Sequence, residues 1–584
     1  MNIQDANVLI DIRNNKYCTQ RAISERTGYS LGSVNNSVNE LVFEGYIDTK
    51  CCITDRGCQA FDNSRPKQAV ILAAGFGTRM VPINTNTSKG LLEVHGEPLV
   101  ERLIIQLHEV GIRDIYIVVG YLKEQYEYLI DEYGVSLIVN NDYILKNNLH
   151  SLKCAVNHLE NSYIIPCDIW FRDNPFRKEE LYSWYLLSEE ESEAGNTRIN
   201  RKMEIVKSTN RDMGNVMVGL AYLTEVDAQF IRRKVVEACD NKVFDNSFWE
   251  DILFDREKFY LHARVIHRDD FVEINTYEQL RELDNNSNQL KTDALEIVAS
   301  VLNVSENEIK NIFVSKKGMT NRSFLFNVGE KRYIMRIPGE GTEKLINRKQ
   351  EAVVYETISK SGFGEKVLYL NPTNGYKLTE YIEGARNCNT QNYEDIKKCM
   401  NILRRFHESN FAVEHIFDIF KQIDFYESLW GERKSVFRDY EKTKSNVFSL
   451  IPYIETHMKP YVLAHIDAVP DNFLFSKNGI TIIDWEYAGM QDPDVDIAMF
   501  CIYSMYEKEE VDRLIDCYYP EGTDEQNRYK IYCYIACCGL LWSNWCEYKR
   551  SLGIEFGDYA LRQYRYAKEY YRIFAERFGD IENE

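Results

Sequence analysis

A glycine-rich segment suited to binding phosphate comes directly after a run of apolar residues. Residues 69–73 are continuously apolar, as a buried parallel strand should be, and Gly75 and Gly77 follow. Glycines in such a turn let backbone N–H groups approach a triphosphate, because a Cβ would collide with it. Arg79 and Lys89 would neutralise phosphate charge during catalysis. The segment predicts a nucleotide site made of Ala73, Ala74, Gly75, Gly77 and Thr78.

A second group of residues, much later in the chain, is suited to phosphoryl transfer. His465, Asp467 and Asn472 follow the pattern His-x-Asp-x-x-x-x-Asn, and Asp484 comes after a predicted hairpin. The pattern resembles the catalytic loop of the kinase-like fold. Asp467 would orient and deprotonate a substrate hydroxyl. Asn472 and Asp484 would hold the Mg²⁺ ions that bridge the ATP phosphates.

Length and composition indicate a soluble multidomain protein. At 584 residues the chain is expected to form about three or four domains. The net charge of −20 argues against chain-wide affinity for DNA or anionic membranes. The 15 cysteines lack metal-ligand spacing and are interpreted as reduced thiols. The N-terminus does not resemble a signal peptide, and the longest apolar run, residues 531–542, is too short to span a bilayer. We expect a cytoplasmic protein without membrane insertion, and homo-oligomerisation stays open.

Residues 1–62 are predicted to form a small helical domain. A short helix ending at Gly28, a second helix over residues 30–43 and two short strands resemble a winged helix-turn-helix domain. The predicted recognition helix is rich in Asn and Ser but contains no Lys or Arg. Base-reading helices usually have basic residues that contact phosphates. DNA binding and a regulatory or dimerising role are therefore both retained as hypotheses.

The remainder of the chain is predicted to form two larger domains, so that the whole is a multidomain α/β protein. Residues 68–284 alternate buried strands with helices, which indicates a doubly wound α/β sheet. Residues 293–580 begin with closely spaced strands and continue as helices. A small β-rich lobe followed by a helical lobe is the order of the bilobal protein-kinase-like α+β fold.

Residues 68–284 resemble the bacterial CTP:phosphocholine cytidylyltransferases. The resemblance is carried by the glycine-rich segment, by Lys89 with residues 91–99, and by residues 120–125 and 147–152. It implies that Asp168 binds Mg²⁺ and that a Glu-Ile-Asp pattern near the domain's end supplies further ligands. Here that pattern reads Glu273-Ile274-Asn275, and Asn275 can coordinate only through an uncharged carbonyl oxygen. The chain also departs from the family before the lysine, where Ser88 replaces a proline.

The same resemblance implies a substrate site and a reaction. A phosphocholine oxygen would attack the α-phosphorus of CTP, with no protein nucleophile. Positioning and charge neutralisation would supply the catalysis. A quaternary ammonium favours aromatic faces and carboxylates. Trp249 could equally be a core residue. The substrate-binding residues predicted from the resemblance are Asn148, Ser151, Trp249, Glu250 and Asp251.

Residues 293–580 resemble the choline/ethanolamine kinase family. The resemblance is carried by the sequence motif Ile-Asp-Trp-Glu-Tyr-Ala-Gly, which begins at residue 483. The resemblance implies that Arg336 stands where protein kinases have their strand lysine and that Glu351 pairs with it. Trp542 and Trp545 could cage trimethylammonium or belong to the core of an apolar helix. The predicted nucleotide-binding residues are Gly318, Thr320, Asn321, Arg336 and Glu351. The predicted substrate residues are Trp485, Glu486, Trp542 and Trp545.

Together the two resemblances predict a bifunctional enzyme. A kinase makes a phosphate monoester from choline and ATP, and a cytidylyltransferase consumes it with CTP to make CDP-choline, both with Mg²⁺. One alternative is the same chemistry on ethanolamine or another amino-alcohol. Another is a DNA-binding regulator that uses enzyme-like domains as sensors, against which the intact Lys89, Asp467, Asn472 and Asp484 count.

Overall fold

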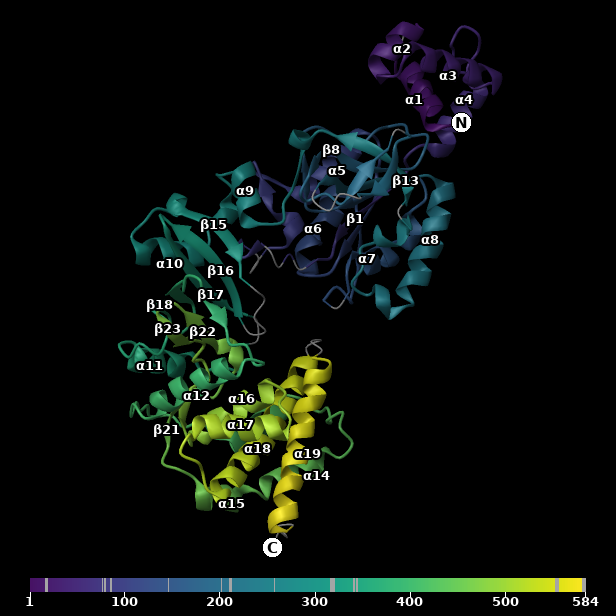
Figure 1. Cartoon of the computed structure of the whole chain (residues 1–584). Helices are drawn as coiled ribbons and strands as arrows, with labels where there is room; N and C mark the ends of the chain where they lie inside the picture. The colour runs from purple at the N-terminus through teal and green to yellow at the C-terminus, as the bar shows by residue number, and fades with distance from the viewer. Residues whose placement is uncertain are drawn as a thin grey trace. The chain divides into compact units, whose positions relative to one another are not determined.

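The computed structural model divides into two compact units, Met1–Thr292 and Asp293–Glu584, which are treated separately below (Figure 1). The predicted multidomain α/β class is confirmed. In the part of the chain that the structure covers, no helix has the length and apolar character needed to cross a membrane. The described residues are 1–15, 19–75, 77, 80–83, 87–144, 146–200, 202–208, 213–256, 258–315, 321–339, 342, 345–551 and 556–579.

The first unit begins with a four-helix winged helix domain. Polar side chains at Asn2, Thr19, Ser30 and Thr54 cap the helices and accept bonds from backbone N–H groups of their first turns. The two predicted wing strands are reduced to a single antiparallel bridge between Ile47 and Ile53. The helices are α1 (Ile3–Asn14), α2 (Gln20–Thr27), α3 (Leu31–Phe43) and α4 (Asp55–Ser64).

The winged helix domain shares its apolar core with the α/β domain that follows. Leu181 lies in the hydrophobic cluster formed by α1, α3 and α4. The Tyr182 hydroxyl donates to Asn7 Oδ1 at 3.1 Å, and Arg13 pairs with Glu179 at 3.2 Å. The two domains are therefore joined by packing as well as by the chain between them.

A ten-stranded sheet forms the body of the first unit. Strands β6, β1, β4 and β5 run parallel to one another at one end of it. Alternate residues of β1 are buried on opposite faces: Ile71 packs in the cluster that contains α5, and Val70 in the cluster that contains α7 and α8. Helices on both faces make the sheet doubly wound, as predicted.

The elements of this α/β domain are as follows. The helices are α5 (Leu99–Glu109), α6 (Tyr128–Tyr133), α7 (Asn148–Cys154), α8 (Glu225–Cys239) and α9 (Tyr277–Leu283). The strands are β1 (Gln68–Ala73), β2 (Glu93–Val94), β3 (Glu97–Pro98), β4 (Asp114–Val119), β5 (Ser136–Val139), β6 (Ser162–Pro166), β7 (Ile169–Phe171), β8 (Trp184–Ser192), β9 (Thr197–Ile199), β10 (Glu204–Lys207), β11 (Gly214–Leu223), β12 (Phe254–Asp255), β13 (Lys258–Ile266) and β14 (Phe271–Glu273).

The second unit has a β-rich lobe followed by a helical lobe. Five strands form an antiparallel sheet in the order β15-β16-β17-β19-β18, with α11 in the same lobe. The predicted hairpin between Asp467 and Asp484 is present as β22 and β23. The strands are β15 (Ile309–Val314), β16 (Asn321–Val328), β17 (Lys331–Pro338), β18 (Val367–Leu370), β19 (Lys377–Glu380), β20 (Arg386–Asn387), β21 (Val462–Ala464), β22 (Phe473–Ser476), β23 (Gly479–Ile482) and β24 (Gly489–Gln491).

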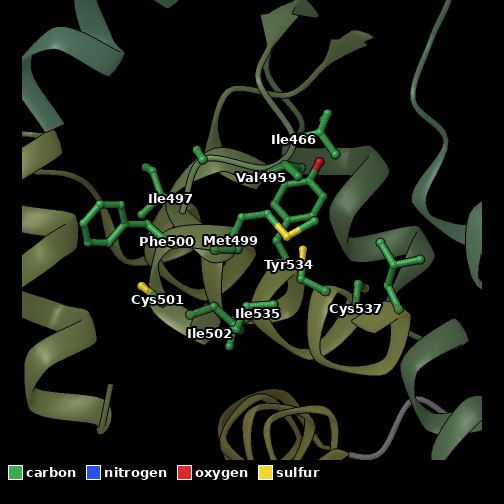
Figure 2. Packing of buried hydrophobic residues seen from close by; sticks show 14 of the residues in the cluster. Ile466, Val495, Ile497, Met499, Phe500, Cys501, Ile502, Tyr534, Ile535 and Cys537 are labelled. Atoms are coloured by element: carbon green, nitrogen blue, oxygen red, sulfur yellow. The ribbon is translucent and has the colours of Figure 1, made fainter. Parts of the chain in front are cut away.

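The core of the helical lobe is built around α16 and α18 (Figure 2). Residues Val495, Ile497 and Phe500 of α16 are fully buried, and Ile466 of the catalytic loop belongs to the same cluster. The predicted catalytic loop is thus anchored directly in the core. The helices are α10 (Asp293–Leu302), α11 (Arg348–Ile358), α12 (Tyr393–His407), α13 (Ile419–Ser428), α14 (Tyr440–Phe448), α15 (Ile451–His457), α16 (Asp494–Tyr503), α17 (Lys508–Tyr518), α18 (Glu525–Ser551) and α19 (Asp558–Phe578).

Candidate active sites

In the first unit, Lys89 lies between two of the predicted metal ligands. Its ammonium group forms an ion pair with Asp168 Oδ2 and donates to Asn275 Oδ1 at 2.8 Å. Asp168 follows β6, which is parallel and adjacent to β1, so the carboxyl ends of both strands meet at one edge of the sheet. The predicted nucleotide segment after β1 and the predicted metal residue therefore lie at the same edge.

Backbone pairing fixes the positions of the predicted metal ligands. Strand β14 pairs with β7, and the Ile274 N–H donates to the Asp168 carbonyl at 2.9 Å. Asp168 Oδ1 is buried and has no hydrogen-bond partner among the described residues. Oxygen donors of this kind are what Mg²⁺ prefers. Asp168 and Asn275, with Glu273 two positions before Asn275, therefore fit a divalent cation.

Ser88 is part of the support for Lys89. Its hydroxyl lies 2.6 Å from the Tyr126 hydroxyl, and its backbone N–H donates to Gln125 Oε1 at 3.0 Å. Ser88 and Tyr126 are both buried. A proline at position 88 could make neither bond, so this chain holds the lysine loop by hydrogen bonds.

Glu250 has an unusual environment in the first unit. The Tyr185 hydroxyl donates to Glu250 Oε1 at 3.0 Å, whereas Oε2 is buried without a hydrogen-bond partner among the described residues. Burial, together with the nearby charges of Asp251 and Glu273, raises the pKa of Glu250 to about 7. A cation bound here would be stabilised by the carboxylate, so the site fits a positively charged headgroup.

The other predicted substrate residues of the first unit shape the wall of this site. Asn148 Oδ1 accepts the backbone N–H of Trp249 at 2.9 Å, and Ser151 is buried and accepts from Asn140 at 3.0 Å. Trp249 is 1% exposed and packs 5.9 Å from the ring of Tyr185, as a core residue would. Asp251 accepts the backbone N–H of Phe248 at 2.8 Å. Asn148, Trp249 and Asp251 therefore order the segment that carries Glu250, whereas Ser151 is bonded to Asn140.

The glycine-rich segment is described in part. Ala73 and Ala74 are buried at the end of β1, and Gly77 has a φ of 60°, which favours glycine. Among the described residues, a Cβ on Gly75 would meet no atom within 4 Å. Thr78 and Arg79 lie outside the described residues, as do Gly318 and Thr320 of the second unit.

In the second unit, Asp467 and Asn472 are directly bonded. Asn472 Nδ2 donates to Asp467 Oδ2 at 3.1 Å and to the Asp467 carbonyl at 2.9 Å. Burial raises the pKa of Asp467 to about 8, and the charges of Asp484 and Glu486 add to the shift. Because the charge of Asp484 contributes to this shift, the predicted base Asp467 and the predicted metal ligand Asp484 lie in one site. Asp484 and Asn472 provide the oxygen donors that Mg²⁺ prefers.

Asp496 holds the catalytic loop in a strained conformation. Ile466 has a φ of 68°, which is unfavourable for a β-branched residue. Asp496 accepts the Ile466 N–H at 2.7 Å, the His465 N–H at 2.8 Å and His407 Nε2 at 2.9 Å. The buried carboxylate therefore offsets the strain in the backbone that directly precedes Asp467.

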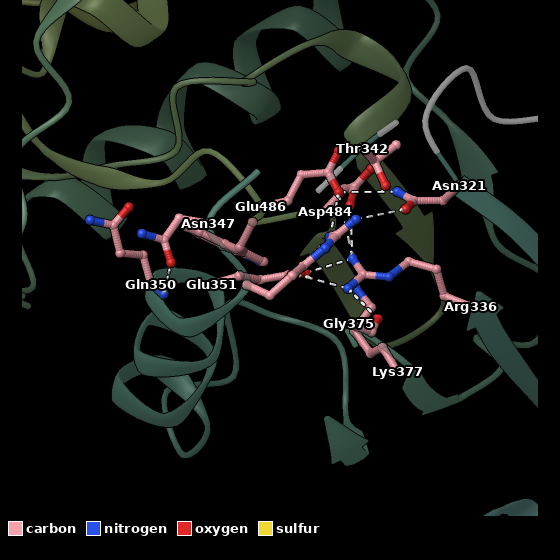
Figure 3. A network of polar contacts seen from close by, with 12 residues as sticks. Asn321, Arg336, Thr342, Asn347, Gln350, Glu351, Gly375, Lys377, Asp484 and Glu486 are labelled. Carbon is pink, nitrogen blue, oxygen red and sulfur yellow. Dashed lines mark hydrogen bonds and ion pairs between the residues drawn. The ribbon is translucent and has the colours of Figure 1, made fainter. Parts of the chain in front are cut away.

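A buried ion network connects the sheet, helix α11 and the metal segment (Figure 3). Arg336 forms a bidentate pair with Glu351, at 2.5 and 2.9 Å. Arg348 bridges Glu351 at 2.9 Å and Glu486 at 3.2 Å, and Asn321 Nδ2 donates to Glu486 at 3.0 Å. The predicted residues Arg336, Glu351, Asn321 and Glu486 are thus brought together, and Glu486 is a scaffold for them.

Aromatic rings gather beside Asp467. Trp542 lies edge-on to Tyr487 at 5.9 Å and to Trp545 at 5.3 Å. Burial raises the pKa of Tyr487, Tyr503 and Tyr559, and the Asp467 carboxylate raises each further, which places these hydroxyls near the base. Tyr487 and Trp542 are partly buried and form an aromatic wall suited to a quaternary ammonium. Trp545 is 4% exposed and lies in the core beside Trp542, as a core residue would.

Trp485 does not belong to that wall. Its ring is fully buried, packs 4.4 Å from His465, and donates through Nε1 to the Ile482 carbonyl at 2.9 Å. It has no open face for a substrate, so the structure places it in the core beneath the catalytic loop. Tyr487, two residues later, lies edge-on to Trp542 instead. The only sequence signal for Tyr487 was its place in the Asp-Trp-Glu-Tyr motif.

Comparison with known proteins relates these sites to established families. Residues 312–564 match the profile of the Choline/ethanolamine kinase family, residues 69–181 that of the MobA-like NTP transferase domain, and residues 1–48 that of Winged helix-turn-helix DNA-binding. Protein LicA of Haemophilus influenzae is 30% identical over 266 residues, or 43% of this chain and 77% of LicA. A choline-phosphate cytidylyltransferase of Streptococcus pneumoniae is 31% identical over 231 residues, or 37% of this chain and 96% of that enzyme. The chain belongs to the choline/ethanolamine kinase and choline-phosphate cytidylyltransferase families.

The protein is therefore an enzyme with a choline kinase-like unit and a cytidylyltransferase-like unit. The predicted fusion of these two with a winged helix domain is confirmed. The cytidylyltransferase unit is also 33% identical, over 203 residues, to a 2-aminoethylphosphonate cytidylyltransferase of Lancefieldella rimae. That match covers 34% of this chain and 82% of that enzyme. Relatives of this unit thus include enzymes named for two different substrates, choline phosphate and 2-aminoethylphosphonate.

Proposed function

We propose that the enzyme makes CDP-choline in two steps, by phosphorylating choline with ATP and coupling the phosphocholine to CTP. The observation that carries the proposal is the aromatic wall of Tyr487 and Trp542 beside the predicted base Asp467. This arrangement combines a carboxylate that can deprotonate a hydroxyl with an aromatic surface that fits trimethylammonium.

The kinase reaction follows from the groups around Asp467. The choline hydroxyl oxygen attacks the γ-phosphorus of ATP, its proton passes to Asp467, and ADP leaves. Arg336, held by Glu351, faces Asp484 at 3.8 Å, which places a fixed positive charge near the phosphates. Asn472 keeps the Asp467 carboxylate oriented. Mg²⁺ held by Asn472 and Asp484 would neutralise charge on the ATP phosphates.

The transferase reaction needs positioning and positive charge. A phosphate oxygen of phosphocholine attacks the α-phosphorus of CTP, the bond to the β-phosphate oxygen breaks, and pyrophosphate leaves. Lys89, supported by Ser88 and Tyr126, would stabilise the charge that develops on the phosphates. Glu250 would hold the ammonium end of the substrate. Mg²⁺ held by Asp168 and Asn275 would supply further charge neutralisation.

Choline is favoured over ethanolamine because of the kind of contact the kinase wall offers. A primary ammonium needs hydrogen-bond acceptors, whereas a quaternary ammonium is satisfied by aromatic faces. Trp542 Nε1 donates a hydrogen bond to Met499 Sδ at 3.0 Å, so the indole ring offers a substrate only its aromatic surface. Ethanolamine, and for the transferase 2-aminoethylphosphonate, are the rival substrates.

Replacing Trp542 tests the proposed choline wall. In Trp542→Ala we expect the KM for choline to rise by about tenfold or more, because a desolvated cation–π contact contributes about 2 kcal/mol. The kcat should change less, since Asp467 is untouched. Trp542→Phe, which keeps an aromatic face, should retain most of the affinity. An equal loss in both variants, measured by steady-state kinetics, would contradict the assignment.

The pKa of Glu250 gives the transferase a defined pH dependence. Below about pH 7 the buried carboxyl is protonated and neutral, so it offers no negative charge that would attract a cationic headgroup. We expect the KM for phosphocholine to fall by about tenfold between pH 6 and pH 8, as the carboxylate forms. Glu250→Gln should have a high KM that no longer falls in this way. If the wild-type dependence persists in Glu250→Gln, another group is responsible.

The winged helix domain is assigned no DNA-dependent role in either reaction. Helix α3 presents Leu31, Asn35, Asn39 and Phe43 to solvent, and no Lys or Arg occurs in the helix. Duplex DNA needs phosphate contacts for affinity. A gel-shift experiment at low salt with fragments from upstream of the protein's own gene is expected to show no complex. A sequence-selective shift would instead support the regulator hypothesis.

A product assay tests the proposal as a whole. Purified protein is incubated with Mg²⁺, ATP, CTP and either choline or ethanolamine, and products are identified by mass. CDP-choline from choline alone is the expected result. CDP-ethanolamine in comparable amounts would contradict the assigned substrate. Phosphocholine without CDP-choline would contradict the transferase half only.

A further inference from the structure

A second buried polar cluster in the kinase-like unit, made of Lys377, Glu365 and Tyr355, has no part in the mechanism so far. Lys377 Nζ pairs with Glu365 Oε1 at 2.7 Å, and the Tyr355 hydroxyl donates to the same oxygen at 2.6 Å. Lys377 also donates to the Tyr355 hydroxyl. All three side chains are buried. Lys377 is the register partner of Arg336 on the neighbouring strand, so the cluster adjoins the ion network of Figure 3.

The cluster reaches the predicted metal ligand Asp484 through the backbone. The Trp485 N–H donates to the Tyr355 hydroxyl at 3.4 Å, and Trp485 directly follows Asp484. Burial and the charge of Glu365 raise the pKa of Tyr355 well above its usual value, so the hydroxyl keeps its proton and donates it to Glu365. The lone pairs of the hydroxyl then accept from Lys377 and from Trp485.

Backbone pairing fixes the cluster against the strand that leads to Asp484. The Ile482 N–H donates to the Phe363 carbonyl at 2.8 Å, and Gly364 forms a parallel bridge with Ile482. Glu365 comes next in the chain. Its carboxylate is therefore held at a set position beside the end of β23.

The backbone at Asp484 is itself strained. Its φ is 67°, in the left-handed region that residues with a Cβ rarely adopt. Such conformations persist only where surrounding contacts hold them. The bond from Trp485 to the Tyr355 hydroxyl is a contact of this kind.

We infer that Tyr355, held by Lys377 and Glu365, is a positioning residue for Asp484. Its hydroxyl fixes the backbone that directly follows Asp484 and so keeps the carboxylate oriented for a divalent cation. It acts through the backbone and not on the substrate. The inference rests on the proposed role of Asp484 as a metal ligand.

Tyr355→Phe tests the inference, because it removes only the hydroxyl. Amide hydrogen exchange of peptides that contain Trp485 is measured in the full chain by mass spectrometry. The Mg²⁺ dependence of choline phosphorylation is measured by ADP release. We expect the Trp485 amide to exchange about fivefold faster, and the half-saturating Mg²⁺ concentration to rise by about the same factor, as one hydrogen bond is lost. The KM for choline should change little, since the aromatic wall is untouched.

Tyr566→Phe is the matched control. Tyr566 is also fully buried in the kinase-like unit, and its hydroxyl donates to the Tyr506 carbonyl at 2.7 Å. The two variants should lose similar stability, but only Tyr355→Phe should change Trp485 exchange and the Mg²⁺ dependence. Lys377→Met removes the ammonium that fixes the Tyr355 hydroxyl and should shift both measurements in the same direction. It keeps the inference testable even if Tyr355→Phe does not fold.

Two results would overturn the inference alone. One is wild-type Trp485 exchange and Mg²⁺ dependence in Tyr355→Phe, and the other is an equal change of both in Tyr566→Phe, which would make general stability the cause. Asp484→Asn separates these from a failure of the proposed metal site. If Asp484→Asn keeps the wild-type Mg²⁺ dependence, Asp484 is not a metal ligand, and the inference fails together with that assignment.

Discussion

Replacing Asp467 by asparagine or alanine is expected to lower choline phosphorylation by about a hundredfold to ten-thousandfold. Asp467 is the side chain placed to take the hydroxyl proton, and its carboxylate is held by Asn472 at 3.1 Å. The measurement is ADP release with saturating choline and ATP. The KM for choline should change little in Asp467→Asn, since the aromatic wall is intact.

The control for Asp467 lies in the same chain. Cytidylyl transfer from added phosphocholine should be unchanged, because it uses residues of the other unit. Burial raises the pKa of Asp467 to about 8, so the folded protein holds this carboxylate at a cost at neutral and higher pH. Asp467→Asn removes that cost, and the Tm at pH 8 should be no lower than in the wild type. Loss of both activities would contradict two independent sites.

Replacing Lys89 by alanine is expected to have the opposite pattern. Pyrophosphate release from CTP and phosphocholine should fall by about a hundredfold or more, as when a positioned electrostatic group is removed from a transition state. Choline phosphorylation should be retained. Lys89→Arg should recover little, because the planar guanidinium does not match the position of the ammonium between Asp168 and Asn275.

A variant of the residue that supports Lys89 distinguishes a catalytic role of the lysine from a structural one. Tyr126→Phe removes the hydroxyl that meets Ser88 at 2.6 Å but leaves Lys89 in place. We expect a smaller decrease in transfer rate from Tyr126→Phe than from Lys89→Ala, at similar Tm. A larger decrease from Tyr126→Phe would mean that the lysine acts mainly as part of the scaffold.

The sequence determined which chemistry the chain carries, because that chemistry needs fixed residue types at short spacings. The glycine-rich turn after β1, and His465, Asp467 and Asn472 within one loop, are local patterns. The chemistry that these local patterns indicate can be inferred without knowing which distant residues contact them. The strand–helix alternation of the first unit and the strand-then-helix order of the second likewise predicted the fold classes, which the structure confirms.

Only the tertiary structure decided which distant residues meet. Lys89 bonds to Asn275 across 186 positions of sequence, and Leu181 completes the core of the winged helix domain. Tryptophan suits cores and cation sites equally well, so the sequence could not separate Trp485 from Trp542. Burial separates them: Trp485 is enclosed beneath the catalytic loop, whereas Trp542 is partly buried beside Tyr487. Burial and charge environment are properties of the packed chain, since each depends on all the elements that surround a side chain.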